Sequence, residues 1–93
     1  MKIIDDLQKL DTLGNKSVVT IGNFDGIHAG HRELIKKTLS LSDEVSISSV
    51  VLTFEPLPEE FFKKKNFFKL MTTTDKLDYF RGAGVDTVIK IPF

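Results

Sequence analysis

The sequence contains 93 residues, in which 13 basic side chains balance 13 acidic ones, and it has two histidines and no cysteine. A chain of this length forms one domain or part of one. Its neutral charge argues against broad nucleic-acid binding, which relies on an excess of Lys and Arg, and the lack of cysteine excludes disulfides and thiolate metal sites. No apolar run approaches the roughly 18 residues of a membrane span, and the acidic N-terminus is unlike a signal peptide, so we expect a cytoplasmic protein.

The first 41 residues predict a helix, a strand and a second helix. Apolar residues recur at helical spacing over residues 2–10, which indicates a short amphipathic helix. Residues 17–22 (SVVTIG) form a short apolar run rich in β-branched side chains, as is typical of a buried parallel strand. Residues 22–28 are expected to form a loop, and an apolar stripe then predicts a helix from about residue 30 to residue 41.

The rest of the chain predicts two further strands with a helix between them. Residues 45–54 (VSISSVVLTF) indicate the first of these strands, and residues 59–68 (EEFFKKKNFF) indicate a short helix or a loop. The TTTD stretch that begins at Thr72 has the spacing of a capping box, so a helix should run from there to about residue 81. Residues 85–91 (VDTVIKI) predict the last strand.

This alternation of strands and helices predicts an α/β fold with a parallel sheet and right-handed crossovers. It corresponds to the βαβαβ half of a doubly wound, Rossmann-like sheet. Ligands bind such sheets outside the carboxyl ends of the strands. The loop after the strand at residues 17–22 is therefore the first place to expect a site.

Residues 20–31 (TIGNFDGIHAGH) contain three glycines and both histidines of the chain. The glycines permit tight turns and a close approach of the backbone to a ligand. Unpaired N–H groups at the start of the following helix favour an anion. His28 and His31 lie about one helical turn apart and can point to the same side, where two imidazoles would suit phosphate oxygens.

Other known motifs fit this loop less well. It has neither the spacing of a P-loop nor that of the dinucleotide fingerprint. Two histidines supply too few ligands for a metal site made by the protein alone, so we expect no such site. A helix cap with two incidental histidines is the structural alternative.

Three blocks, in this order, resemble bacterial FAD synthetases, the bifunctional riboflavin kinase/FMN adenylyltransferases. GNFDGIHAGH (residues 22–31) is similar to their G-x-F-D-G-x-H-x-G-H signature, a variant of the (T/H)xGH motif of the wider nucleotidyltransferase superfamily. VVLTFEPLPEEFF (residues 50–62) resembles their second block, and LMTTTDKLDYFRGAGVDTVIKIPF (residues 70–93) resembles their third. The first block alone would indicate only a nucleotidyltransferase, whereas the three together favour this family.

The resemblance implies a Rossmann-like nucleotidyltransferase that transfers AMP from ATP to FMN, with Mg²⁺, and yields FAD and pyrophosphate. Such a transfer needs positioning and charge stabilisation rather than a covalent nucleophile. His28 and His31 would be the catalytic residues that hold the phosphates, and Glu55 would help to orient substrate or metal. The residues expected to bind ATP are Gly22, Asn23, Phe24, Asp25, Gly26, His28, Gly30 and His31.

Two departures from the family pattern limit what the resemblance implies. Leu57 stands where the family usually has His, so the role of that position is open. The later phosphate-binding block and the riboflavin kinase domain are absent, so residues 1–93 are expected to form the N-terminal part of one FMN adenylyltransferase domain and to be inactive alone. A non-catalytic nucleotide-binding fragment and another adenylyl- or cytidylyltransferase are the alternatives. Small-molecule substrates, with no nucleic acid or membrane, are the expected partners; the oligomeric state is left open.

Overall fold

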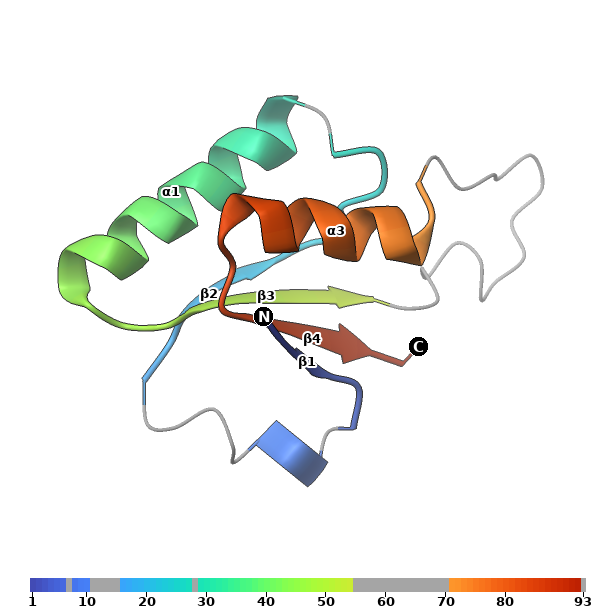
Figure 1. Cartoon of the computed structure of the whole chain (residues 1–93), viewed down its shortest axis with the longest axis horizontal. Helices are drawn as coiled ribbons and strands as arrows, with labels where there is room; N and C mark the ends of the chain where they lie inside the picture. The colour runs from blue at the N-terminus through green and yellow to red at the C-terminus, as the bar shows by residue number, and fades with distance from the viewer. Residues whose placement is uncertain (7, 11–15, 28, 55–70, 93) are drawn as a thin grey trace.

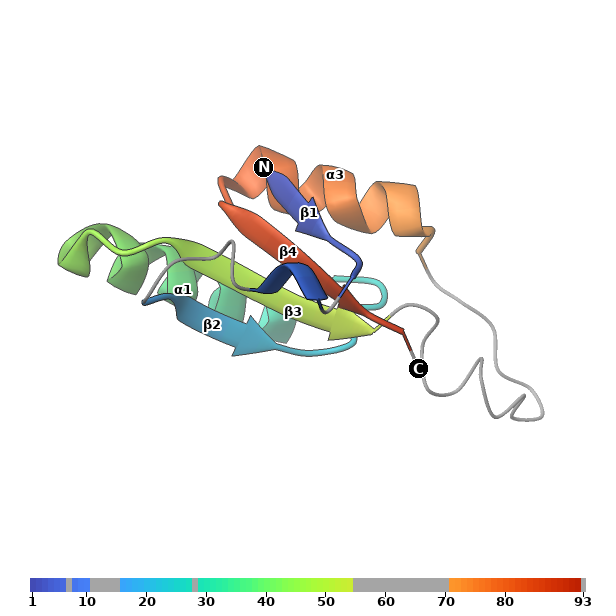
Figure 2. The same ribbon diagram turned by 90° about the horizontal axis from the view of Figure 1, so that it is seen from below.

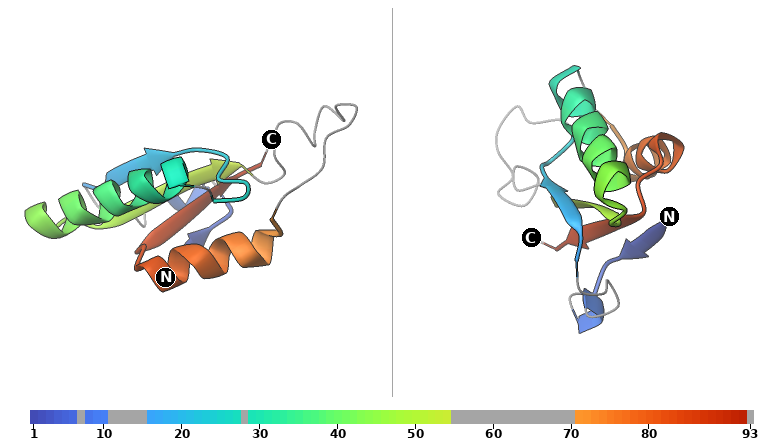
Figure 3. Two further views of the ribbon diagram at one scale, coloured as in Figure 1. Left: turned by 90° about the horizontal axis from the view of Figure 1, so that it is seen from above. Right: turned by 90° about the vertical axis from the view of Figure 1, so that its left-hand side faces the viewer.

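The computed structural model describes residues 1–6, 8–10, 16–27, 29–54 and 71–92. Within these residues, four parallel strands form one sheet in the order β1-β4-β3-β2. Two helices lie on one face of the sheet (Figure 1 and Figure 3). The elements are β1 (Lys2–Ile4), β2 (Val18–Ile21), α1 (Ala29–Val45), β3 (Ser49–Phe54), α3 (Thr73–Ala83) and β4 (Thr87–Ile91).

The strands β2, β3 and β4 follow one another across the sheet, with α1 and α3 between them in sequence. Right-handed crossovers that proceed in one direction place both helices on the same face. The chain reaches β2 from β1, which lies at the opposite edge, and residues 8–10 form a short 3₁₀ turn on the other face of the sheet (Figure 2). The predicted α/β, βαβαβ arrangement is therefore confirmed, and β1 is added beyond β4.

The helix predicted over residues 2–10 was wrong. Lys2–Ile4 forms β1, and the Lys2 N–H donates to the Asp86 carbonyl at 2.9 Å as this strand pairs with β4. Ile4 is buried in a small cluster with Val50 and Ile89 on the face opposite the helices. The helical spacing misled because pairing with a strand more than eighty residues away along the chain outweighed the local pattern.

The remaining elements match the predictions, with shifted ends. Helix α1 continues to Val45, so β3 begins four residues later than predicted, at Ser49. The capping prediction for α3 is confirmed, because the Thr72 Oγ1 accepts from the Asp75 N–H at 3.0 Å. Gly84 ends this helix in the left-handed conformation, with φ of 99°. The helix or loop predicted over residues 59–68 lies outside the described residues.

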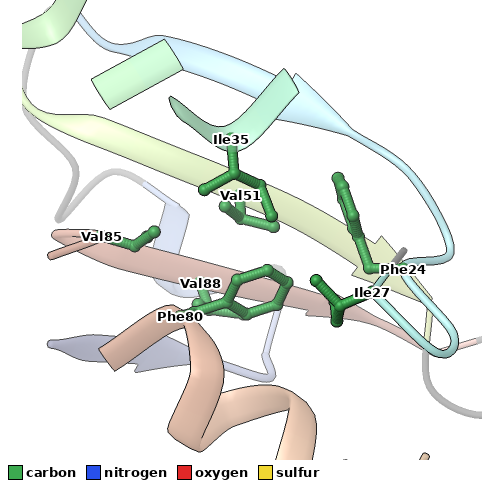
Figure 4. Close-up of a cluster of buried hydrophobic side chains, with 7 residues drawn as sticks. All are labelled: Phe24, Ile27, Ile35, Val51, Phe80, Val85 and Val88. Atoms are coloured by element: carbon green, nitrogen blue, oxygen red, sulfur yellow. The ribbon is translucent and has the colours of Figure 1, made fainter. Parts of the chain in front are cut away.

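The main core lies between the sheet and the two helices (Figure 4). Helices α1 and α3 each contribute one large side chain, and β3 and β4 contribute valines from their helix-facing side. Two members come from the loop between β2 and α1, so the core fixes the shape of that loop. The cluster comprises Phe24, Ile27, Ile35, Val51, Phe80, Val85 and Val88.

Candidate functional site

One edge of the sheet gathers the features that the sequence singled out. We call it the carboxyl edge, because the parallel strands all end there. The loop of residues 22–27 follows β2 at this edge and leads into α1, and α3 also begins there (Figure 1 and Figure 3). A helix N-terminus carries partial positive charge and unpaired N–H groups, so the start of α1 favours a bound anion, whereas the start of α3 is capped by Thr72.

Three residues of the 22–27 loop have left-handed backbone. The φ angles are 52° for Phe24, 82° for Gly26 and 29° for Ile27. This region is unfavourable for a residue with a side chain, and such strain persists only where the surroundings hold it. Here the core supplies the restraint, because Phe24 and Ile27 are completely or almost completely buried.

The Phe24 ring is the centre of this restraint (Figure 4). Its edge-on contacts join the loop to both helices, with ring centroids 5.5 Å from Phe80 and 5.3 Å from His31. Phe24 was expected to bind ATP; since its side chain is buried, only its backbone can face a ligand.

The three glycines expected to form turns have different environments. Gly26 has the positive φ that favours glycine. Gly22 still pairs with the sheet, because its N–H donates to the Leu52 carbonyl at 3.1 Å, and a Cβ there would lie 3.0 Å from two ring carbons of Phe24. Gly30 is the second residue of α1, so it forms no turn.

Polar side chains from other elements anchor the loop. The carbonyl of Asn23 accepts from the Lys76 Nζ at 2.8 Å and from the Thr53 Oγ1 at 3.2 Å. The Lys76 Nζ also donates to the Thr53 Oγ1 at 3.3 Å. Farther along the loop, the Asp25 Oδ1 accepts from the Met71 N–H at 3.0 Å, just before α3. The loop is thus joined to β3 and to the start of α3.

A hydrogen bond also joins the loop to α1, and His31 lies beside the loop. The Arg32 Nε donates to the Ile27 carbonyl at 3.2 Å. His31 is the third residue of α1 and is half-buried, with its ring edge-on to Phe24. The structure therefore brings His31 to the same helix N-terminus as the loop.

Several predicted residues cannot be placed. His28, Glu55 and Leu57 lie outside the described residues, so the expected pairing of the two histidines stays a prediction. Among the described residues, no group of three or more His, Cys, Asp or Glu side chains could hold a metal ion.

Lys76 and Thr53 were not among the residues predicted to belong to the site. A usable signal existed, because Lys76 precedes Phe80 by four residues and therefore shares its helix face. A lysine on the apolar face of a short helix is unusual, since lysine is almost never fully buried without polar partners. Both Lys76 and Thr53 have no exposed surface in the fold.

A polar hollow lies at the opposite, amino edge of the sheet. The Asp86 carboxylate there accepts from the N–H of Ser49 at 2.9 Å and from its hydroxyl at 3.3 Å. These hydrogen bonds join the start of β3 to the residue before β4 and satisfy the buried polar groups of Ser49. The hollow is lined by Ser42, Asp43, Ser46, Ile47, Ser48 and Asp86.

Comparison with known proteins matches this chain to one family. A family model described as FAD synthetase matches residues 11–93. Relatives named bifunctional riboflavin kinase/FMN adenylyltransferase include those of Haemophilus influenzae, 37% identical over 94 residues, and Escherichia coli strain K12, 36% identical over 95 residues. The relative from Buchnera aphidicola of Schizaphis graminum is 36% identical over 94 residues. The chain is covered completely in each comparison and spans about 30% of the length of these relatives.

A solved structure supports the fold. The crystal structure of a macrolide-efflux protein from Streptococcus pneumoniae superposes on this chain with a TM-score of 0.76 and 24% sequence identity. The match covers 98% of this chain and 31% of the other. No helix among the described residues is long and apolar enough to cross a membrane.

Proposed function

Because this chain belongs to the FAD synthetase family, we propose that it carries the nucleotide-binding part of an FMN adenylyltransferase. The reaction would transfer AMP from ATP to FMN and release pyrophosphate. The observation that carries the proposal is the family match over residues 11–93 together with the anchored 22–27 loop at the start of α1. The chemistry of that loop suits a phosphate-bearing ligand.

The proposed step is an in-line substitution at the α-phosphorus of ATP. An oxygen of the FMN phosphate forms the new bond to this phosphorus, and the bond to the β-phosphate bridging oxygen breaks with its electron pair leaving on pyrophosphate. Charge accumulates on the phosphoryl oxygens, so the protein assists by positioning and by hydrogen-bond donors already in place. The loop amides, the start of α1 and the imidazole of His31 are the donors that we assign to this task.

The other residues expected in the site would contact the phosphates, orient the substrate or enclose the nucleotide. His28 would act with His31 on the phosphates, and Glu55 would orient substrate or metal. Gly22, Asn23, Asp25, Gly26 and Gly30 would form the wall around the nucleotide.

Mg²⁺ would supply additional charge stabilisation when bound. It is usually held by one or two carboxylates together with substrate phosphates, rather than by a cage of protein ligands. Asp25 is the carboxylate of the 22–27 loop, held at the carboxyl edge by the Met71 N–H, and it would hold the ion there together with the phosphates. The ATP phosphates would then provide most of the ligands.

The test is an assay of the complete product of the gene. FAD formation from FMN, ATP and Mg²⁺ is expected, with pyrophosphate released in equal amount. Parallel reactions with CTP, and with acceptors other than FMN, distinguish a different nucleotidyltransferase. Calorimetry with ATP distinguishes a nucleotide-binding protein without turnover, and that result would overturn the proposal.

A further inference from the structure

We propose that Lys76 is a positioning residue of the nucleotide site, because it fixes the orientation of the peptide bond between Asn23 and Phe24. Lys76 itself would not touch the ligand, since its side chain is completely buried. It would act through the loop, by presenting the Phe24 N–H to a phosphate oxygen. This inference rests on the proposed function for the identity of the ligand, but its structural part stands on contacts within the chain.

The first step is the position of the Lys76 amino group. It lies 2.8 Å from the Asn23 carbonyl and 3.3 Å from the Thr53 Oγ1, and the Thr53 Oγ1 is itself 3.2 Å from that carbonyl. One carbonyl oxygen thus accepts from side chains on β3 and α3. Two donors from separate elements restrain its direction more strongly than either one alone.

The second step follows from the planarity of the peptide bond. In a trans peptide the C=O and the next N–H point in opposite directions. Since the Asn23 carbonyl points toward the buried Lys76 and Thr53, the Phe24 N–H points away from both. A rotation of this peptide would turn the N–H inward and bring the carbonyl oxygen to the side where an anion would bind.

The third step is that the loop needs such a restraint. Phe24 has a φ of 52°, which is unfavourable for a residue with a side chain. The buried ring holds the side chain of Phe24, but it leaves the peptide before it to be fixed by hydrogen bonds. Lys76 and Thr53 supply them from the side opposite to the proposed ligand.

The choice of lysine supports a role beyond packing. Methionine would fill a similar volume in α3 without burying a polar group, and the net contribution of a hydrogen bond to stability is modest, because folding exchanges it for bonds to water. What lysine adds at this position is a donor that reaches the Asn23 carbonyl. Its contribution is therefore expected in the order of the loop more than in the stability of the fold.

The experiment compares four variants in the complete product of the gene. Lys76→Met removes the donor, and Lys37→Met, on the exposed surface of α1, is the control for loss of a positive charge. Thr53→Val removes the hydroxyl and keeps the shape, whereas Thr53→Ser keeps the hydroxyl and should restore function. The Thr53 pair keeps the proposal testable even if Lys76→Met does not fold.

Two readouts separate positioning from stability. In amide NMR spectra, titration with Mg²⁺ and ATP should shift the Phe24 signal saturably in the unsubstituted protein and in Lys37→Met, but not in Lys76→Met. In FAD assays, Lys76→Met should raise the KM for ATP by about tenfold to hundredfold and leave the KM for FMN almost unchanged. Thr53→Val should also weaken the Phe24 response and raise the KM for ATP, but by less than Lys76→Met does.

The outcomes are distinct. An unchanged Phe24 response in both Lys76→Met and Thr53→Val would overturn the inference, and so would an equal rise in the KM for ATP and for FMN, which marks a general loss of structure. If the unsubstituted protein binds ATP but forms no FAD, the proposed function is wrong, while the Phe24 titration still decides the role of Lys76.

Discussion

At the amino edge of the sheet, Ser49 and Asp86 hydrogen-bond to each other across neighbouring strands. The Asp86 carboxylate accepts from the Ser49 N–H and hydroxyl, and the Ser49 Oγ accepts from the Asp86 N–H at 3.0 Å. At the carboxyl edge, Thr53 and Lys76 instead direct their hydrogen bonds to the backbone of a loop. Both edges contain buried polar groups. Those at the amino edge hold two strands together, whereas those at the carboxyl edge hold a loop.

This difference supports the carboxyl edge as the place of the proposed nucleotide site. The bonds between Ser49 and Asp86 satisfy each other and fix the register of two strands, which is a structural task. The bonds of Thr53 and Lys76 hold a loop in which Phe24 and Ile27 are both left-handed, and strain of this kind clusters at functional sites. The amino edge also has a left-handed residue, Ser46 with φ of 55°, but the bonds between Ser49 and Asp86 do not hold it. The position at the carboxyl ends of the strands agrees with this interpretation.

The largest expected effect comes from Phe24→Ala. This change removes the ring that joins the loop to the core, so we expect it to lower the free energy of unfolding by about 3–5 kcal/mol. Denaturant titration of the variant measures the loss. Phe24→Leu, which retains much of the apolar volume, should lose less. A loss below about 1 kcal/mol in Phe24→Ala would show that the core does not hold the loop.

The second prediction concerns chemistry at the carboxyl edge. His31→Ala should reduce the rate of FAD formation by about 100-fold to 1,000-fold, because under the proposed function it removes a donor to the phosphates. The imidazole is half-buried, so the free energy of unfolding should fall much less. Single-turnover assays and thermal melting measure the two effects side by side. A variant with the rate of the unsubstituted protein would exclude this role for His31.

At the amino edge, we expect a substitution to lower the stability of the fold and to leave activity almost unchanged. In Asp86→Ala, the buried Ser49 N–H and hydroxyl lose their acceptor, which should cost about 1–3 kcal/mol of unfolding free energy. The KM values for ATP and FMN should remain unchanged at a temperature where the variant is folded. A selective rise in the KM for ATP would mean that the two edges are coupled.

How much of the fold and of the site the sequence predicts depends on how far apart the contacting residues lie along the chain. The ends of α3 were predictable because Thr72 and Gly84 act on their own helix. The strand β1 was not, because it depends on β4, more than eighty residues later. The same limit applies to the site: the glycines and His31 are visible in one short stretch, whereas Lys76 reaches Asn23 from a helix more than fifty residues away.

The smallest expected effect tests the backbone of the carboxyl edge directly. Gly26 has a φ of 82°, so alanine there should cost about 1–2 kcal/mol, the usual cost of the left-handed conformation for a residue with a Cβ. Gly82→Ala is the matched control, because a Cβ at Gly82, within α3, would meet no other atom within 4 Å. Replacing a helical glycine by alanine should instead stabilise the fold by about 0.5–1 kcal/mol.

The two glycine variants should therefore shift the denaturation midpoint in opposite directions. Gly26→Ala should also weaken ATP binding by more than its loss of stability explains, since the loop would change shape, whereas Gly82→Ala should leave ATP affinity unchanged. Calorimetry with ATP measures this second effect. If alanine at Gly26 were as stabilising as alanine at Gly82, the loop would have no need of its left-handed glycine, and Lys76 and Thr53 would not be holding a strained backbone there.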